Sequence, residues 1–133
     1  FNLGQALEDE QGVPYPGTDE FASPVPQVME AWHKAEIMGV ESFTSFEDRV
    51  TSVLQEAANP GVRVLCVTSG GVIGMIIRHL LNLDPTRMAH VLLPIMNSSL
   101  HRVRVLPQGP ILASFNAVPH LDQDDRLHAQ THY

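Results

Sequence analysis

The sequence predicts an α/β layer fold with a parallel sheet, and the order of its middle segments is the main reason. An amphipathic stretch over residues 41–57 is followed by an apolar run at residues 62–69, "VRVLCVTS", and by a second amphipathic stretch at residues 70–83. Helix, strand, turn and helix in this order place parallel strands in one sheet. The 44% hydrophobic and 17% charged content fits one globular domain over residues 1–133.

The first third combines a proline-rich loop with one helix. Residues 11–26 contain four prolines and two glycines, which exclude a regular helix or a central strand. Residues 27–39, "QVMEAWHKAEIMG", place apolar side chains at roughly helical spacing. We expect a helix here, with Ser23 as its cap and Gly39 as its C-terminal stop.

A second helix is expected from about residue 42 to residue 57. Ser42 or Thr44 can cap its start, and Asn59, Pro60 and Gly61 end it. Its apolar residues follow the i, i+3, i+4, i+7 pattern: Phe43, Phe46, Val50, Val53, Leu54 and Ala57.

The run after this helix predicts a strand and then a third helix. Residues 63–68 are apolar nearly throughout and rich in β-branched side chains, which is typical of a central strand buried on both faces. We expect Val64 and Cys66 to be buried there. The following helix, residues 71–81, has a predicted apolar face of Val72, Ile73, Ile76, Ile77, Leu80 and Leu81.

The last third predicts a short helix and a hairpin. Asp84 can cap a helix whose first residue is Pro85. Residues 98–106 alternate imperfectly between apolar and polar side chains, as in a strand. Residues 107–110 can form a turn, and residues 111–115 can form a second short strand. This pattern predicts an antiparallel hairpin at one side of the sheet.

Composition excludes several classes of protein. A net charge of −7 gives no general attraction to phosphate backbones, so no nucleic-acid partner is expected. No run reaches the roughly 18 apolar residues of a membrane span, and the lone Cys66 fits a reducing compartment, so we expect a cytoplasmic protein. Phe1 is not an initiator methionine, which leaves processing, a cloned fragment or a preceding part of the chain open.

The turn Thr68, Ser69, Gly70 and Gly71 is the predicted ligand site. A strand running into a helix exposes the first helical N–H groups at the carboxyl end of the sheet, where glycines give access and the helix dipole favours an anion. The alternative is that both glycines only make the turn and pack helix against strand. The P-loop, dinucleotide and nucleophile-elbow motifs do not fit these residues, and no cofactor is expected.

Four segments in order resemble the C-terminal half of the histidine phosphatase superfamily, the phosphoglycerate-mutase-like proteins. They are "ESFTSFEDRV", "VRVLCVTSGGVIGMIIRHLL", "LLPIMNSSLHRVRV" and "ILASFNAVPHL", spanning about residues 41–121. The resemblance implies a three-layer α/β/α fold with a mostly parallel sheet. It also implies phosphoryl transfer through a phosphohistidine, with a first His in an Arg-His-Gly motif and a second His in a Ser-His-Gly motif.

The chain departs from that family pattern at both histidines. It contains no Arg-His-Gly motif, so the nucleophile is not in these residues and the domain is expected to lack its N-terminal part. The resemblance puts Ser69 at the position of the second His and Thr68 at the Ser before it. A hydroxyl can donate one hydrogen bond to a phosphoryl oxygen but carries no positive charge, so catalysis is in doubt.

Other polar residues allow weaker hypotheses. Asn97 and His120 flank the hairpin in the resembling segments, where they either form the edge of the pocket or serve as a turn cap and a packing residue. His128 and His132 have i, i+4 spacing near several Asp residues, but they lie in a polar terminal stretch and we expect no metal site.

Three functions remain open from the sequence. The first is a phosphatase of the phosphoglycerate-mutase-like class that acts on a phosphomonoester, with a phosphorylated small molecule or phosphate as its ligand. The second is a noncatalytic module that binds an anion or a protein through the same pocket. The third is an unrelated Rossmann-like domain with purely structural glycines, and a homodimer is an alternative to a monomer in each case.

Overall fold

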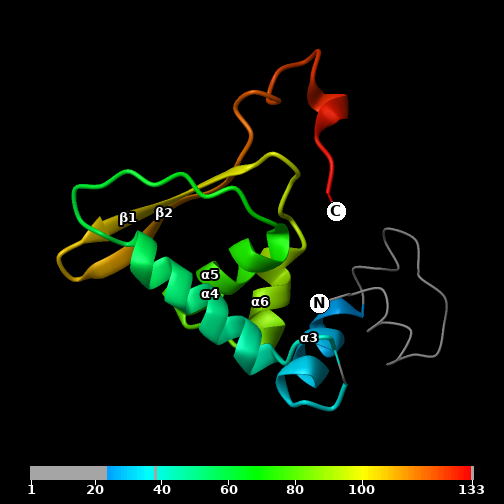
Figure 1. Ribbon diagram of the computed structural model, residues 1–133. Helices are drawn as coiled ribbons and strands as arrows, with labels where there is room; N and C mark the ends of the chain where they lie inside the picture. The colour runs from blue at the N-terminus through cyan, green and yellow to red at the C-terminus, as the bar shows by residue number, and fades with distance from the viewer. Residues whose placement is uncertain (1–23, 38, 133) are drawn as a thin grey trace.

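The computed structural model describes residues 24–37 and 39–132, which form a helical layer and a β-hairpin (Figure 1). The elements are α3 (Val25–His33), α4 (Phe43–Ala57), α5 (Gly70–Leu81), α6 (Pro85–Leu92), β1 (Leu100–Leu106), β2 (Gly109–Ala117) and the short 3₁₀ helix η1 (Leu127–Ala129). Among the helices described, none is long and apolar enough to cross a membrane.

The hydrophobic core lies where the four α-helices meet. Helix α3 packs against α6, and α5 lies between α6 and α4. The core residues are Val25, Val28, Met29, Trp32, Phe43, Phe46, Val50, Met75, Met88 and Ala89. Trp32 meets Phe43 edge to face, with ring centroids 5.1 Å apart, so the end of α3 is fixed against the start of α4.

Helix α3 ends earlier than its sequence pattern predicts. The predicted stop was Gly39, but Ala35 takes a left-handed conformation at φ 58° and the helix ends at His33. The N–H of Glu36 donates to the carbonyl of Ala31, and that of Ala35 to Trp32, which is the Schellman pattern of a helix end. Ser23, the expected cap, lies outside the described residues.

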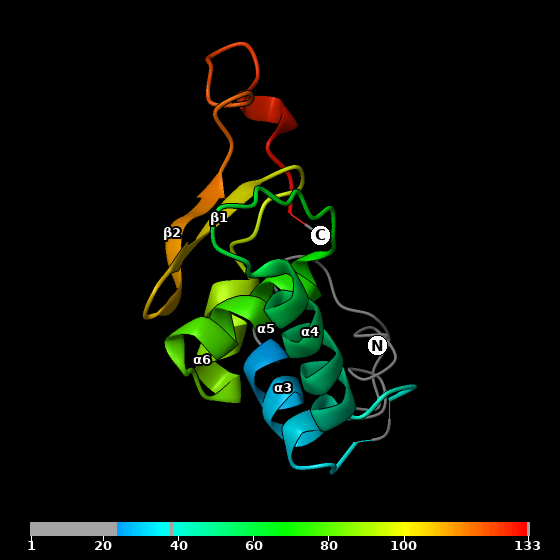
Figure 2. The ribbon, with the colours of Figure 1, turned by 60° about the vertical axis from the view of Figure 1, so that its left-hand side comes forward.

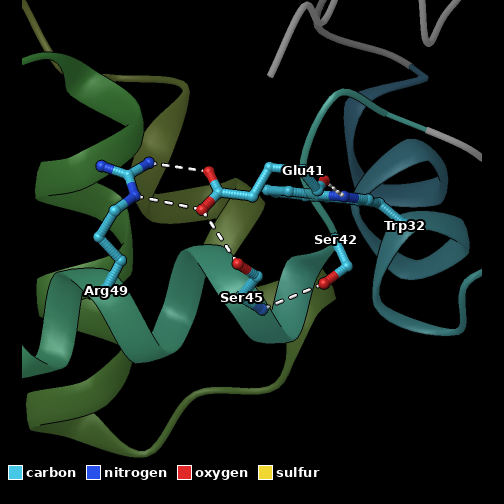
Figure 3. A network of polar contacts seen from close by, with 5 residues as sticks. All are labelled: Trp32, Glu41, Ser42, Ser45 and Arg49. Atoms are coloured by element: carbon cyan, nitrogen blue, oxygen red, sulfur yellow. Dashed lines mark hydrogen bonds and ion pairs between the residues drawn. The ribbon is translucent and has the colours of Figure 1, made fainter.

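Helix α4 begins at a network of polar contacts that ties it to α3 (Figure 3). Ser42, one of the two predicted caps, accepts the N–H of Ser45. The Glu41 carboxylate accepts hydrogen bonds from Arg49 Nε at 3.1 Å and Nη2 at 2.8 Å, and these bonds lower the pKa of Glu41. The Glu41 carbonyl accepts the indole N–H of Trp32 at 2.9 Å, so one residue fixes both helices.

Helix α5 has apolar side chains on two faces, not only on the predicted one. Its buried residues are Gly74, Met75 and Ile77, which lie toward α4 and α6. From the predicted face, Val72, Ile73 and Ile76 are only partly buried, and Leu81 is 52% exposed. Val72 and Ile76 still pack against the core, so this side of α5 is partly covered.

The hairpin is confirmed by the structure. Strands β1 and β2 pair antiparallel from Leu100↔Ala117 to Leu106↔Gly109, around a tight turn at Pro107 and Gln108. Register shifts occur between Leu100 and Arg102 and again between Arg102 and Val103. Because each shift moves side chains to the other face, these irregularities account for the imperfect alternation in the sequence.

No parallel sheet is found in the described part of the chain, which corrects the prediction of a central strand. The extended segment, residues 62–69, arches over the helices beside the hairpin without strand pairing (Figures 1 and 2). Its residues are all exposed, including Cys66, with Val64 54% and Val67 93% exposed. An apolar strand is buried only when its backbone groups find partners, and no strand described here pairs with this segment.

Gly74 is predicted to be required for the packing of α5 on α6. A Cβ atom at Gly74 would lie 3.3 Å from Leu92 Cδ1 and 3.7 Å from Met88 Cε, whereas one at Gly71 would meet nothing within 4 Å. We expect Gly74→Val to lower the free energy of unfolding by roughly 1–3 kcal/mol, because overpacking forces the two helices apart. Gly71→Val is the matched control and should change it by less than about 0.5 kcal/mol in urea denaturation. Equal effects of the two variants would contradict the close packing.

Candidate functional site

A large hollow separates the helical layer from the hairpin. Its volume is about 1180 Å³, and its lining comes from all four α-helices, the extended segment, residues 95–99 and the hairpin, mainly β1. Val72, Ile73 and Ile76 of α5 are among the lining residues. The predicted ligand turn, Thr68 to Gly71, lies at the rim of this hollow and joins the extended segment to α5.

The turn leaves several hydrogen-bond donors without partners. Ser69 is the N-cap residue of α5 with extended backbone angles, φ −91° and ψ 162°, but its side chain makes no capping bond. Thr68 and Ser69 are both exposed, and no partner for either hydroxyl is found within the described residues. Helix α5 begins at Gly70, so the N–H groups before Ile73, whose N–H donates to the Ser69 carbonyl, have no intrahelical partners.

The two glycines of the turn are not needed for its backbone. Neither Gly70 nor Gly71 has a positive φ. A Cβ atom at Gly70 would meet Ile95 Cγ2 at an ordinary 3.8 Å, and one at Gly71 would meet nothing. The close-packed glycine of this helix is Gly74. The interpretation of Gly70 and Gly71 as purely structural glycines therefore finds no steric support.

The site loop, residues 94–99, lies next to the turn and is held by Asn116. The Asn116 side chain donates to the carbonyl of Pro94 at 2.6 Å and accepts the N–H of Met96 at 2.8 Å. The contact between Ile95 and the Gly70 position brings this loop against the start of α5. Residues 95 to 99 of the loop also line the hollow.

The structure brings Asn97 to the hollow and links His120 to it indirectly. Asn97 lines the hollow, while its N–H donates to the carbonyl of Thr131 at 2.7 Å and its side-chain amide donates to the Thr131 hydroxyl at 3.0 Å. His120 Nε2 lies 3.1 Å from Ser98 Oγ, and Ser98 lines the hollow. Both predicted edge residues thus have polar partners in the site loop or the C-terminal segment.

Sequence reasoning missed a second serine and histidine pair at the same place. Ser99 Oγ lies 2.8 Å from His101 Nε2, and His101 Nδ1 accepts the backbone N–H of Asn116 at 3.2 Å. Both residues are partly buried and line the hollow, and burial lowers the pKa of His101. The two residues are i and i+2 in an extended stretch, a spacing that places side chains on one face and that could have suggested the pair.

Positive charge at the site is limited to an arginine that already has a partner. Arg49 lines the hollow, but the Glu41 carboxylate binds its guanidinium group. Arg78 pairs with Glu47 and stacks on Phe43, inside the helical layer. Over the stretch that the structure describes, the rim of the hollow therefore offers neutral donors near Ser69 and no free guanidinium group.

Metal binding is not supported by the described residues. They contain no group of three or more His, Cys, Asp or Glu side chains that could hold a metal ion. His128 lies in η1, and His132 forms an isolated bridge with Met96 of the site loop. The two histidines with i, i+4 spacing thus belong to different local structures.

Comparison with known proteins gives one match. The sequence model of the histidine phosphatase superfamily (branch 1) matches residues 11–118, which is most of the chain and includes the turn, the site loop and both strands. No curated protein and no solved structure matches the chain.

His101 is predicted to make stability fall in mild acid. Its pKa is lowered in the folded protein, so the unfolded chain binds the proton first as pH falls below about 6.5, and the free energy of unfolding decreases until the folded pKa is passed. We expect His101→Gln to reduce this loss between about pH 7 and pH 5 in urea denaturation. His79→Gln, on the exposed side of α5, is the matched control. An unchanged pH dependence in His101→Gln would show that His101 does not titrate in this way.

Proposed function

Because this chain belongs to the histidine phosphatase superfamily, we propose that it is the C-terminal portion of a phosphatase that acts on a phosphomonoester through a phosphohistidine. The turn formed by Thr68, Ser69, Gly70 and Gly71 binds the phosphoryl group. The phosphohistidine forms on a residue outside this chain, since the sequence contains no Arg-His-Gly motif.

The observation that carries the proposal is the set of free donors at the turn. The unpaired N–H groups at the start of α5 and the hydroxyls of Thr68 and Ser69 can all donate to phosphoryl oxygens. Gly70 and Gly71 lack side chains although the backbone does not require glycine there, which leaves room for a ligand. The helix dipole adds a favourable potential for an anion at the same point.

Ser69 is the residue we propose for direct contact with the phosphoryl group in catalysis. It stands where the family places its second His, and it offers one neutral hydrogen bond in place of a chargeable imidazole. Replacing a preorganised charged donor by a neutral one costs a few kcal/mol of transition-state stabilisation, roughly 3 kcal/mol in comparable sites. The proposed enzyme is therefore slow unless another group supplies charge.

The extended segment supports a larger, three-layer domain around this site. Its apolar side chains and unpaired strand backbone suit a central strand, and the partly buried Val72, Ile73 and Ile76, which line the hollow, suit a helix that packs under a sheet. The hollow of about 1180 Å³ exceeds the roughly 300–1,000 Å³ of small-molecule pockets, which favours additional strands beside the segment over a ligand alone. We propose that those strands lie outside the described residues.

A noncatalytic module is the second candidate function. Two observations favour it: Ser69 provides no charge, and the arginine that lines the hollow is already paired with Glu41. Such a protein would bind phosphate or a phosphorylated molecule without turnover.

The exposed apolar segment also supports a homodimer, because unpaired strand edges associate with copies of themselves. An exposed, unpaired Cys66 thiol fits the reducing cytoplasm.

Phosphate binding at the turn is the direct test of this proposal. We expect inorganic phosphate to bind the chain in titration calorimetry, and Gly70→Leu to weaken binding about tenfold or more by occupying the ligand position. Thr44→Leu, an exposed change near the start of α4, is the control and should bind as the wild type does. Unchanged affinity in Gly70→Leu would move the phosphate site away from the turn.

Turnover gives a separate prediction about the missing nucleophile. The chain of 133 residues should release no aryl alcohol from an aryl phosphate and should form no phosphohistidine. In a longer polypeptide that carries an Arg-His-Gly motif, Ser69→His should raise the rate, because an imidazolium adds charge at the transition state. Turnover by the 133 residues alone would refute a nucleophile outside the chain, and a lower rate in Ser69→His would refute the role of Ser69.

A further inference from the structure

The hydrogen bonds around His101 fix which of its ring nitrogens carries the proton. The backbone N–H of Asn116 is only a donor, so His101 Nδ1, which lies 3.2 Å from it, must accept. The neutral ring therefore carries its proton on Nε2. That nitrogen lies 2.8 Å from Ser99 Oγ and donates to it.

This arrangement leaves the hydroxyl proton of Ser99 available. A serine hydroxyl has one proton to donate and two lone pairs, and the bond from His101 uses one lone pair. No other partner of Ser99 Oγ is found in the described part of the chain. His101 is therefore not a base that activates Ser99, because its Nε2 is already protonated. It is a donor that orients the Ser99 hydroxyl.

The neighbouring pair, Ser98 and His120, lacks this fixed direction. Both residues are exposed, and no partner is found for the second ring nitrogen of His120 among the residues that the structure describes. Either residue of this pair can therefore donate. Ser98 is the natural comparison for Ser99, since the two serines are adjacent and both line the hollow.

The loop that carries Ser99 is held rigidly at the ligand turn. Ser98 and Asn116 both have left-handed backbone conformations, with φ 59° and 56°, which non-glycine residues keep only where surrounding contacts fix them. Asn116 supplies those contacts through its bonds to Pro94 and Met96 and to the His101 ring. Ile95 of the same loop lies against the Gly70 position, and both the loop and the turn line the hollow.

We propose that Ser99 is a further ligand-binding residue of this site, which donates its hydroxyl proton to an oxygen of the phosphoryl group held at the turn, and that His101 is its positioning residue. This inference rests on the proposed function and deepens it. The phosphoryl group would then be bound from two sides, by the start of α5 and by the site loop. No bond is broken in this role, since Ser99 acts only as a hydrogen-bond donor.

Inorganic phosphate is the probe for this contact, with affinity measured by titration calorimetry. We expect Ser99→Ala to weaken phosphate binding about tenfold, the effect of one lost hydrogen bond to a charged group. Ser99→Thr keeps the hydroxyl and should bind within about twofold of wild type, whereas Ser99→Val, which has the same shape as threonine without the hydroxyl, should bind as Ser99→Ala does. Ser98→Ala is the control and should bind as wild type does.

The outcomes separate this inference from the proposed function. Normal affinity in Ser99→Ala and Ser99→Val, together with weakened binding in Gly70→Leu, would overturn the role of Ser99 and leave the turn as the site. Weakened binding in the Ser99 variants with normal affinity in Gly70→Leu would move the phosphate site from the turn to the site loop, and would overturn both the proposed function of the turn and the two-sided contact inferred here. Absence of phosphate binding in the wild type would overturn both.

Nitrogen NMR of the histidine rings tests the positioning role without any ligand. At neutral pH, His101 should show a protonated Nε2 and an unprotonated Nδ1, and the Ser99→Val variant should shift the Nε2 signal because its acceptor is lost. A proton found on Nδ1 would overturn the inference directly, even in a variant whose stability had changed.

Discussion

The structure depends on the rule that an apolar strand can be buried only with its backbone groups paired. Residues 62–69 have the composition of a buried strand, yet none of the strands described pairs with them, and they remain exposed. Most of these residues line the hollow. The extended segment also ends at the turn, so Thr68 and Ser69 of the turn are exposed because no strand described here pairs with the segment.

In the described part of the chain, the four α-helices pack into one layer with no parallel sheet against them. Trp32, Phe43 and Met75 fill the space between the helices, and Gly74 lets α5 approach α6 closely. The Glu41 carbonyl and carboxylate then connect α3 to α4 at the surface. Val72 and Ile76 of α5 pack against the same core and also line the hollow, so they are only partly buried.

Elements with local signals could be predicted from the sequence, and elements that need distant partners could not. Ser42 before α4 and Asp84 with Pro85 before α6 fix those helix starts within a few residues, and the tight turn fixes the hairpin. The prediction of a central strand at residues 63–68 was wrong for the described structure, because a strand forms only when a neighbouring strand pairs with it. The turn lies in one stretch of sequence and could be proposed. Ser99 and His101 are also close in sequence, but the bond from Asn116 that fixes the His101 ring joins residues 15 apart and could not be predicted.

The C-terminal segment, residues 119–132, gives the site loop a thermodynamic connection to the rest of the chain. This segment follows the part matched by the family model, and it returns to the loop through the bonds between Thr131 and Asn97 and through the bridge between His132 and Met96. Closing such a long connection costs conformational entropy that only a few hydrogen bonds offset. If the ligand proposed above binds at this loop, its binding and the docking of the segment are linked equilibria: the free energy that the docked segment adds to ligand binding equals the free energy that the bound ligand adds to docking of the segment.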